Sequence, residues 1–355
     1  MTTVGANFVS TNFLANSLVG PVMQAQSQLT NAMIEMSTGQ YADLGLQLGD
    51  QSGYELSLKE QVGQLQTLTT GNSVVSTNLS TAQNALSAIQ KNAQTTLNNL
   101  AAWTPSGTSG ASLQNMGQSG LQSLISGANA TSGDQYVFGG INSAVAPMAD
   151  YYSTPASAAK TAVDQAFQTT FGVLPSDPAA ANISASDMQS FLSGPFAALF
   201  QGASWSTDRS SASSDNTSAT IAPGQTVTTS TNANQPGFQQ LAQAYTMLSE
   251  FGGSALSSDA QQAVATAAAS LVSQGVDSMI NIQAELGSSQ SAVTSANKSM
   301  SSQLTILQGQ LGNLDNVNST ATAAEISSLT NQIQMAYELT SRLQQVNLAQ
   351  YLPVA

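Results

Sequence analysis

Cysteine and histidine are both absent from this chain of 355 residues. Without them the protein has no thiolate nucleophile, no disulfide, no imidazole base and none of the usual zinc ligands. These absences exclude much hydrolase, redox and zinc chemistry. We therefore expect a protein that is not an enzyme and that carries no cofactor or metal ion.

Charged residues are scarce, at 7% of the chain, and Lys+Arg 6 against Asp+Glu 19 give a net charge of -13. Such a chain repels phosphate backbones, so nucleic acid is not an expected partner. No apolar run reaches the length of about 18 residues that a membrane span needs, and we expect no membrane insertion. The first basic side chain is Lys59, so we expect no cleavable secretory signal peptide.

Two matches to the S-x-x-K pattern are the nearest approach to a catalytic motif. They join Ser157 to Lys160 and Ser295 to Lys298. The companion motifs S-D-N and K-T-G of the serine enzymes that use this pattern are missing, and so is any nucleotide-binding glycine loop. In a chain so rich in serine, both matches are best interpreted as chance.

Two long helices are predicted by the spacing of apolar residues. Between residues 68 and 100, and again between residues 264 and 311, these residues recur at alternating steps of four and three. This heptad rhythm is typical of a helix that packs along a seam. The similar lengths of the two segments favour pairing with each other.

Shorter apolar stripes at helical spacing lie at both ends of the chain, in residues 14–36 and 326–346. A single helix of this length is marginal in water, although each fully buried large side chain contributes about 1.5–3 kcal/mol, so each stripe needs a partner. Neighbouring subunits could cover the small neutral faces with little charge to desolvate; an inert helical hairpin is the alternative. We predict an assembly interface formed by Leu14, Leu18, Leu29, Met33, Met36, Ile326, Leu329, Ile333, Leu343, Val346, Leu348, Tyr351 and Leu352.

The middle of the chain differs in composition, because seven of the ten prolines fall in residues 147–236. Residues 136–138 predict a short strand that Gly139 and Gly140 end. The sequence thus predicts a mainly α fold, a long antiparallel helical coiled-coil rod formed by both ends of the chain with an inserted smaller mixed lobe that contains β structure. The predicted domains are a terminal helical assembly domain (1–35 plus 325–355), a helical rod domain (36–145 plus 238–324) and a variable outer lobe (146–237).

Several stretches resemble the bacterial flagellin family, and most closely its members at the junction of flagellar hook and filament. The stretches are MSTGQ at 36–40, LISGANAT at 124–131, YVFGG at 136–140, APM at 146–148 and VNLAQYL at 346–352. The resemblance covers roughly residues 8–150 and 238–352. The loop that follows the first helix departs from the family pattern, with GDQSG in place of its acidic signature.

This resemblance implies an extracellular structural subunit, exported through the flagellar type III apparatus, that self-assembles into a ring-like layer. Its implied partners are the other junction protein on the hook side, flagellin on the filament side and an export chaperone at the C-terminal helix. Two alternatives stay open. One is flagellin itself, the main filament subunit; the other is a secreted helical adhesin whose lobe binds a ligand.

Overall fold

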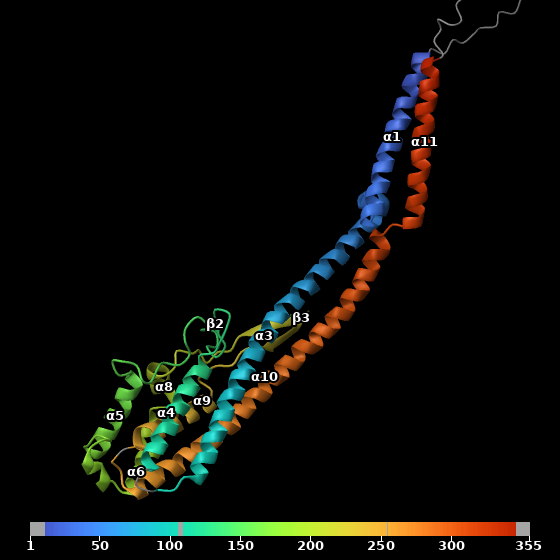
Figure 1. Cartoon of the computed structure of the whole chain (residues 1–355). Coiled ribbons are helices and arrows are strands. Elements are labelled where there is room, and N and C mark those ends of the chain that lie inside the picture. The colour runs from blue at the N-terminus through green and yellow to red at the C-terminus, as the bar shows by residue number, and fades with distance from the viewer. Residues whose placement is uncertain (1–10, 106–108, 254, 346–355) are drawn as a thin grey trace, which may run out of the picture. The chain divides into compact units, whose positions relative to one another are not determined.

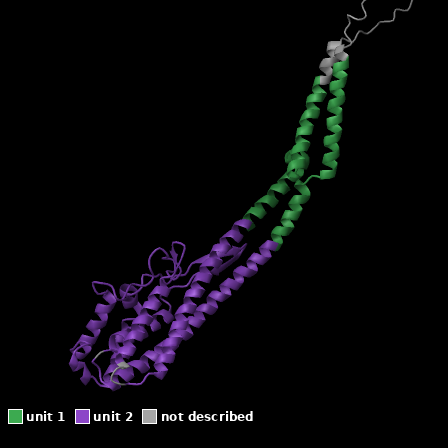
Figure 2. Ribbon diagram, in the orientation of Figure 1, with its two compact units in different colours: residues 1–65, 302–355 green, residues 66–301 purple. Residues whose placement is uncertain are grey.

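The computed structural model describes residues 11–105, 109–253 and 255–345. The chain is mainly helical, as predicted, and divides into two compact units (Figures 1 and 2). Unit 1 comprises residues 1–65 and 302–355, and unit 2 comprises residues 66–301. The three predicted domains with their boundaries remain a prediction.

Unit 1 is built from both ends of the chain. Helix α1 (Thr11–Thr38) pairs with helix α11 (Ser319–Gln345). The segment that follows α1 and the segment that precedes α11 are joined by two backbone hydrogen bonds. The Tyr41 amide donates to the Asp315 carbonyl at 3.0 Å, and the Val317 amide donates to the Gly39 carbonyl at 3.0 Å. Gly39 has a φ of 74°, which glycine adopts without a steric penalty. Unit 1 also contains α2 (Leu44–Leu48), the 3₁₀ turn Gly49–Gln51, the start of α3 (Ser52–Ala102) and the end of α10 (Ser258–Asp315).

The long helices α3 and α10 lie side by side in unit 2 (Figure 1). The side-chain amide of Gln83 donates to the backbone carbonyl of Gln283 at 2.7 Å, and the side-chain amide of Gln290 donates to the Ser80 hydroxyl at 3.0 Å. These helices confirm the two predicted from the heptad spacing. The buried seam positions in unit 2 are Asn72, Leu79, Ala82, Leu86, Ile89, Ala93, Thr96 and Leu100 on α3, and Val264, Ala268, Met279, Ile282, Leu286, Val293, Ala296 and Met300 on α10.

Helices α4 (Ser109–Ala128) and α9 (Pro236–Phe251) pack closely in unit 2. A Cβ added to Gly117 would lie 2.2 Å from the Ser249 backbone nitrogen and 2.6 Å from the Tyr245 carbonyl oxygen. No side chain larger than hydrogen fits at that approach without moving a backbone. Glycine at this position therefore sets the spacing of the two helices.

The inserted lobe is mixed, as predicted, and its core is continuous with α9. The Phe167 ring stacks on Phe251 at a centroid distance of 5.3 Å, and Phe191 meets both rings edge-on. Its helices are α5 (Ala158–Phe171), α6 (Ala185–Ser193), α7 (Pro195–Ala198) and α8 (Gly202–Asp208), with the 3₁₀ turn Pro178–Asn182 and an antiparallel hairpin of β3 (Ser218–Ala222) and β4 (Gln225–Thr228).

The strand predicted at residues 136–138 is shorter and begins earlier. Strand β2 (Gln135–Tyr136) pairs with β1 (Thr131–Ser132), and the chain leaves the strand after Tyr136. Beyond Tyr136 the backbone pairs with two different segments, since the Val137 amide donates to the Ala130 carbonyl at 3.0 Å and the Phe138 carbonyl accepts from the Ala233 amide at 2.9 Å. Phe138 is fully buried, with its ring 5.2 Å from that of Phe238 on α9.

Candidate assembly surface

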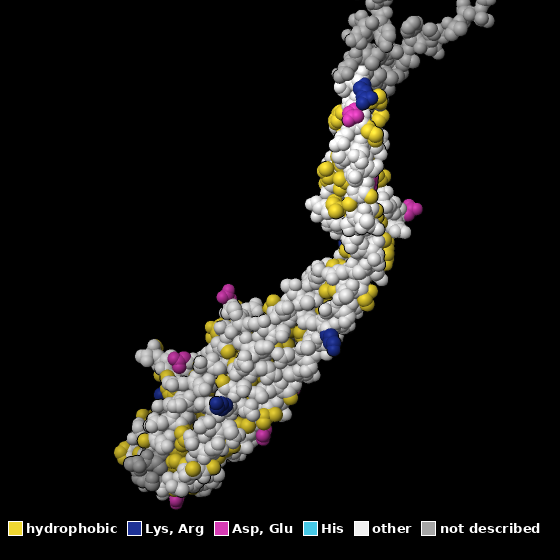
Figure 3. All heavy atoms as spheres, turned by 45° about the vertical axis from the view of Figure 1, so that its right-hand side comes forward, with side chains coloured by type: hydrophobic (Ala, Val, Ile, Leu, Met, Phe, Trp, Pro, Cys, Tyr) yellow, Lys and Arg dark blue, Asp and Glu magenta, His cyan; other side chains and the backbone are white. Residues whose placement is uncertain are grey.

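Unit 1 has a thin core and many exposed apolar side chains. Among the described residues its buried hydrophobic side chains are only Ala32, Leu58, Leu65, Leu329 and Ile333. Of the 17 large hydrophobic side chains that are exposed in the described part of the chain, 12 belong to this unit, which holds about a third of the residues. These are Val19, Met23, Met33, Ile34, Met36, Leu46, Tyr54, Leu56, Ile306, Met335, Tyr337 and Leu339. Figure 3 shows hydrophobic side chains as yellow patches on one face of the molecule.

The pairing of α1 with α11 confirms the prediction that helices from both ends of the chain pack together. Leu329 and Ile333 on α11 are buried, and the side-chain amide of Gln26 donates to the Tyr337 hydroxyl at 2.7 Å. Pairing occurs because a helix needs only one apolar stripe to bind another helix. It leaves Met33 and Met36 about half exposed, so the pair is incompletely covered.

The predicted interface residues occupy different positions in this pair. Leu29 and Ile326 are half-buried. Leu14, Leu18 and Leu343 belong to the helices, but their side chains lie outside the described residues, as do Val346, Leu348, Tyr351 and Leu352. The part that each residue plays in assembly therefore stays a prediction.

The sequence reasoning missed a second apolar stripe on α11. Met335 and Leu339 lie four residues apart, on a different face from Leu329 and Ile333, and are 61% and 49% exposed. Residues four apart on a helix share a face, so this spacing carries a signal that could have been found. On α1 the missed exposed side chains are Val19, Met23 and Ile34.

The surface of the α1/α11 pair carries little charge. The only charged residues within the two helices are Glu35 on α1 and Glu325, Glu338 and Arg342 on α11. Removing charge from water is costly, and neutral amides and hydroxyls cost less when they find new partners. This surface can therefore be covered by another protein with little desolvation penalty.

A charge cluster of two buried acids and a half-exposed lysine holds the end of α10 against the start of α3 within unit 1. The Lys59 ammonium pairs with the Glu55 carboxylate and lies 3.5 Å from Oδ2 of Asp315, whose side chain is 2% exposed. The hydrogen bond with Glu55, aided by the charges of both acids, raises the pKa of Lys59. The Lys59 ammonium thus forms ion pairs with two carboxylates at the C-terminal end of α10.

The S-x-x-K match of Ser157 and Lys160 has a structural role. Ser157 caps α5: its hydroxyl accepts from the Lys160 amide at 3.1 Å and donates to the Tyr151 carbonyl at 2.8 Å. The Lys160 ammonium is bound to Glu250 and does not face that hydroxyl as a base. Within the described ranges no group of three or more acidic side chains is placed to hold a metal ion. None of the described helices is long and apolar enough to cross a membrane.

Helices from the two ends of the chain pair with each other, and this pair leaves apolar side chains exposed. The structure is therefore that of a helical subunit with an uncovered surface on its terminal helices. Comparison with protein families identifies the class further. Residues 9–143 match the bacterial flagellin N-terminal helical region, and residues 269–352 match the flagellin C-terminal helical region. Together the two matches take in more than half of the chain. The chain belongs to the bacterial flagellin family, whose members are structural and not enzymatic, and it is a structural subunit of the flagellum.

One solved structure with a related arrangement comes from Vibrio parahaemolyticus, a protein assigned as a flagellar hook-associated protein. The two chains are 12% identical with a TM-score of 0.49, and the alignment covers 75% of this chain and 97% of the other. A likeness this distant does not bear on function. No curated protein matches the chain.

Proposed function

We propose that this protein is the subunit that joins the flagellar hook to the filament, and that it assembles outside the cell through unit 1. The observation that carries the proposal is the imbalance in unit 1, where twelve large apolar side chains are exposed and five hydrophobic side chains are buried among the described residues. The stretches at 124–140 and 346–352, which resemble junction subunits, support this place in the organelle over others.

Assembly follows from the free energy that the uncovered side chains can still release. A large apolar side chain that is half exposed in the lone subunit gains roughly 1 kcal/mol when a neighbour covers it. Association of two proteins costs about 4–15 kcal/mol in lost freedom of motion. Contacts with several neighbours at once are therefore needed, which a closed layer of subunits provides.

The partners in this proposal are further copies of the chain, the second junction protein on the hook side and flagellin on the filament side. An export chaperone would cover the C-terminal helix before secretion. Met335 and Leu339 on α11 are exposed and would face water in the cytoplasm, so they are suitable contacts for such a chaperone.

The main filament subunit is the second candidate, because the family matches cover the two terminal regions of flagellin itself. Deletion of the gene separates the two. Loss of a junction subunit leaves complete hooks without filaments and releases unpolymerised flagellin into the medium. Loss of a filament subunit leaves filaments that are short, weak or absent, with no such release. Normal motility with loss of surface attachment would instead favour the secreted adhesin.

A further inference from the structure

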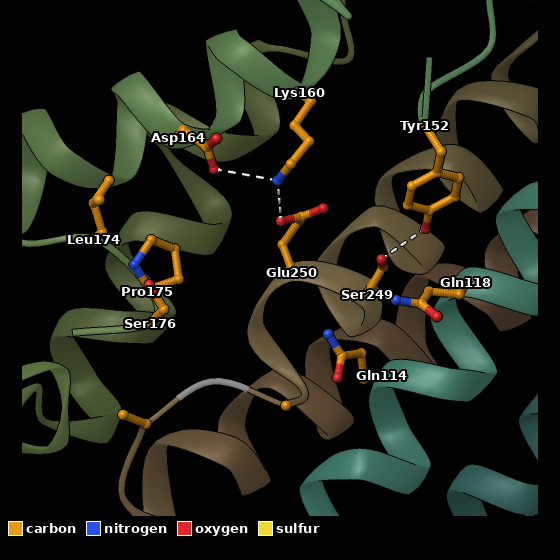
Figure 4. A pocket seen from close by; sticks show the side chains of 12 residues that line it. Gln114, Gln118, Tyr152, Lys160, Asp164, Leu174, Pro175, Ser176, Ser249 and Glu250 are labelled. Atoms are coloured by element: carbon orange, nitrogen blue, oxygen red, sulfur yellow. Dashed lines mark hydrogen bonds and ion pairs between the residues drawn. The ribbon is translucent and has the colours of Figure 1, made fainter. Parts of the chain in front are cut away.

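A polar cavity of about 670 Å³ opens in unit 2 (Figure 4). It lies between α4, α5, the end of α9 and the loop at residues 174–176. Sites for small molecules are typically about 300–1,000 Å³ in volume. This cavity is therefore large enough for a small organic ligand.

Two glutamine side chains supply hydrogen-bonding groups that nothing in the described part of the chain uses. Gln114 and Gln118 lie one turn apart on α4 and point toward the cavity (Figure 4). Both are half-buried, and neither side chain has a hydrogen-bond partner among the described residues. Each amide offers two donor hydrogens and one acceptor oxygen, so a ligand in the cavity would meet donors and acceptors together.

The opposite wall carries one cation between two acids. Nζ of Lys160 lies 2.8 Å from Oε2 of Glu250 and 3.6 Å from Oδ1 of Asp164. Burial, the largest single influence, would lower the pKa of Lys160, but the hydrogen bond and charge of Glu250, together with Asp164, raise it overall. The wall therefore keeps its ammonium and has a net charge of one negative unit. Such a wall disfavours an anionic ligand.

A hydroxyl pair completes the polar lining. The Tyr152 and Ser249 hydroxyl oxygens lie 2.7 Å apart. Burial raises the pKa of Tyr152 to about 12, so the phenol stays neutral and can donate or accept. Leu174 and Pro175 add apolar surface to the lining. This mixture suits a ligand that carries many hydroxyl groups on a small apolar frame.

We propose that this cavity binds a neutral mono- or disaccharide. Neighbouring sugar hydroxyls would donate to the carboxylates of Glu250 and Asp164 and accept from the side-chain amides of Gln114 and Gln118. The inference does not rest on the flagellar role, because every residue it uses belongs to unit 2.

The test is saturation-transfer NMR on the full chain with glucose, galactose, mannose, N-acetylglucosamine, maltose and cellobiose, and with glucuronate as the anionic comparison. We expect at least one neutral sugar to bind in the millimolar range, and glucuronate to bind more weakly. Failure of every neutral sugar to show transfer, or equal binding of glucuronate, overturns the proposal.

A double variant, Gln114→Ala with Gln118→Ala, assigns the binding to the cavity. Each hydrogen bond that is lost should weaken binding by about 3- to 10-fold. Gln122→Ala is the matched control, since this exposed glutamine lies on the same helix and does not line the cavity. Unchanged binding in the double variant overturns the proposal. Should the double variant not fold, Gln118→Ala alone decides in the same way.

Discussion

The side-chain amide of Gln26 donates a hydrogen bond of 2.7 Å to the hydroxyl of Tyr337, a residue 311 positions away in the sequence. The bond joins α1 to α11, so the two ends of the chain bind each other before any neighbour is present. What a neighbour would add is cover for the faces that this pairing leaves uncovered, Met33 on α1 and Met335 on α11 among them.

Tyr337→Phe should loosen the α1/α11 pair slightly. The change removes the acceptor for Gln26, and because both side chains are exposed, the loss should be near the lower end of the roughly 0.5–1.5 kcal/mol that a hydrogen bond contributes. Hydrogen exchange of the α1 and α11 amides should accelerate by a few-fold. Tyr54→Phe, which removes a longer hydrogen bond to Gln310 elsewhere in unit 1, is the control and should leave the exchange of α11 unchanged.

Met335→Glu combined with Leu339→Glu should block polymerisation and leave the fold intact. Both side chains are exposed in the lone subunit, so the charges cost little there and must be desolvated only on assembly. Sedimentation of assembled material and circular dichroism measure the two effects. Gln332→Glu with Gln334→Glu adds the same charge at exposed positions of the same helix and should disturb assembly less. Full polymerisation of the Met335/Leu339 variant would contradict a role for this stripe.

Lys59→Met should destabilise unit 1 by about 1 kcal/mol at neutral pH, because it leaves the buried Glu55 and Asp315 carboxylates without their cation. Solvent limits the loss, since the Lys59 side chain is 45% exposed. The folded pKa of Lys59 is raised above its ordinary value of 10.5. Its contribution is therefore complete below pH 10.5 and is lost as the pH rises through the folded value. Urea unfolding across that range measures this loss.

Lys59→Arg provides the comparison, since arginine keeps its charge to higher pH. Its unfolding free energy should fall less steeply above pH 10.5 than that of the parent chain. Identical alkaline profiles for the two chains would show that Lys59 does not stabilise the end of α10.

Gly117→Ala should destabilise unit 2 by about 1–3 kcal/mol, because the new methyl group meets the backbone of α9 at Ser249 and Tyr245. Thermal unfolding measures the change. Gly71→Ala, at a helical position with nothing within 4 Å, is the matched control and should stabilise the chain by about 0.5–1 kcal/mol. A loss of stability at residue 71 as large as that at residue 117 would show that the close approach of α4 and α9 is not the cause.

The long helices could be predicted because burial in a helical seam imposes a period on neighbouring residues. Leu79, Leu86 and Ile89 on α3 follow that period, and all three are buried. The strand predicted at residues 136–138 was misplaced, because a local preference for a strand does not specify its partner; the Phe138 carbonyl accepts from the amide of Ala233, far along the chain.

Of the two candidate sites, the sequence indicated the assembly surface in part and the polar cavity not at all. Spacing alone pointed to the apolar stripes of the terminal helices, but their pairing decided that Leu329 and Ile333 are covered and Met335 and Leu339 are not. The polar cavity could not be found in the sequence, because Gln114, Lys160 and Glu250 come together only when α4, α5 and α9 pack.

The helical class, the family and the lack of charge on the terminal helices could thus be predicted from the sequence, since composition and local period are properties of neighbours in the chain. Which apolar faces remain uncovered and which polar groups line a cavity became known from the packing of the helices. These depend on contacts between residues far apart in sequence, such as Gln26 with Tyr337 and Lys160 with Glu250.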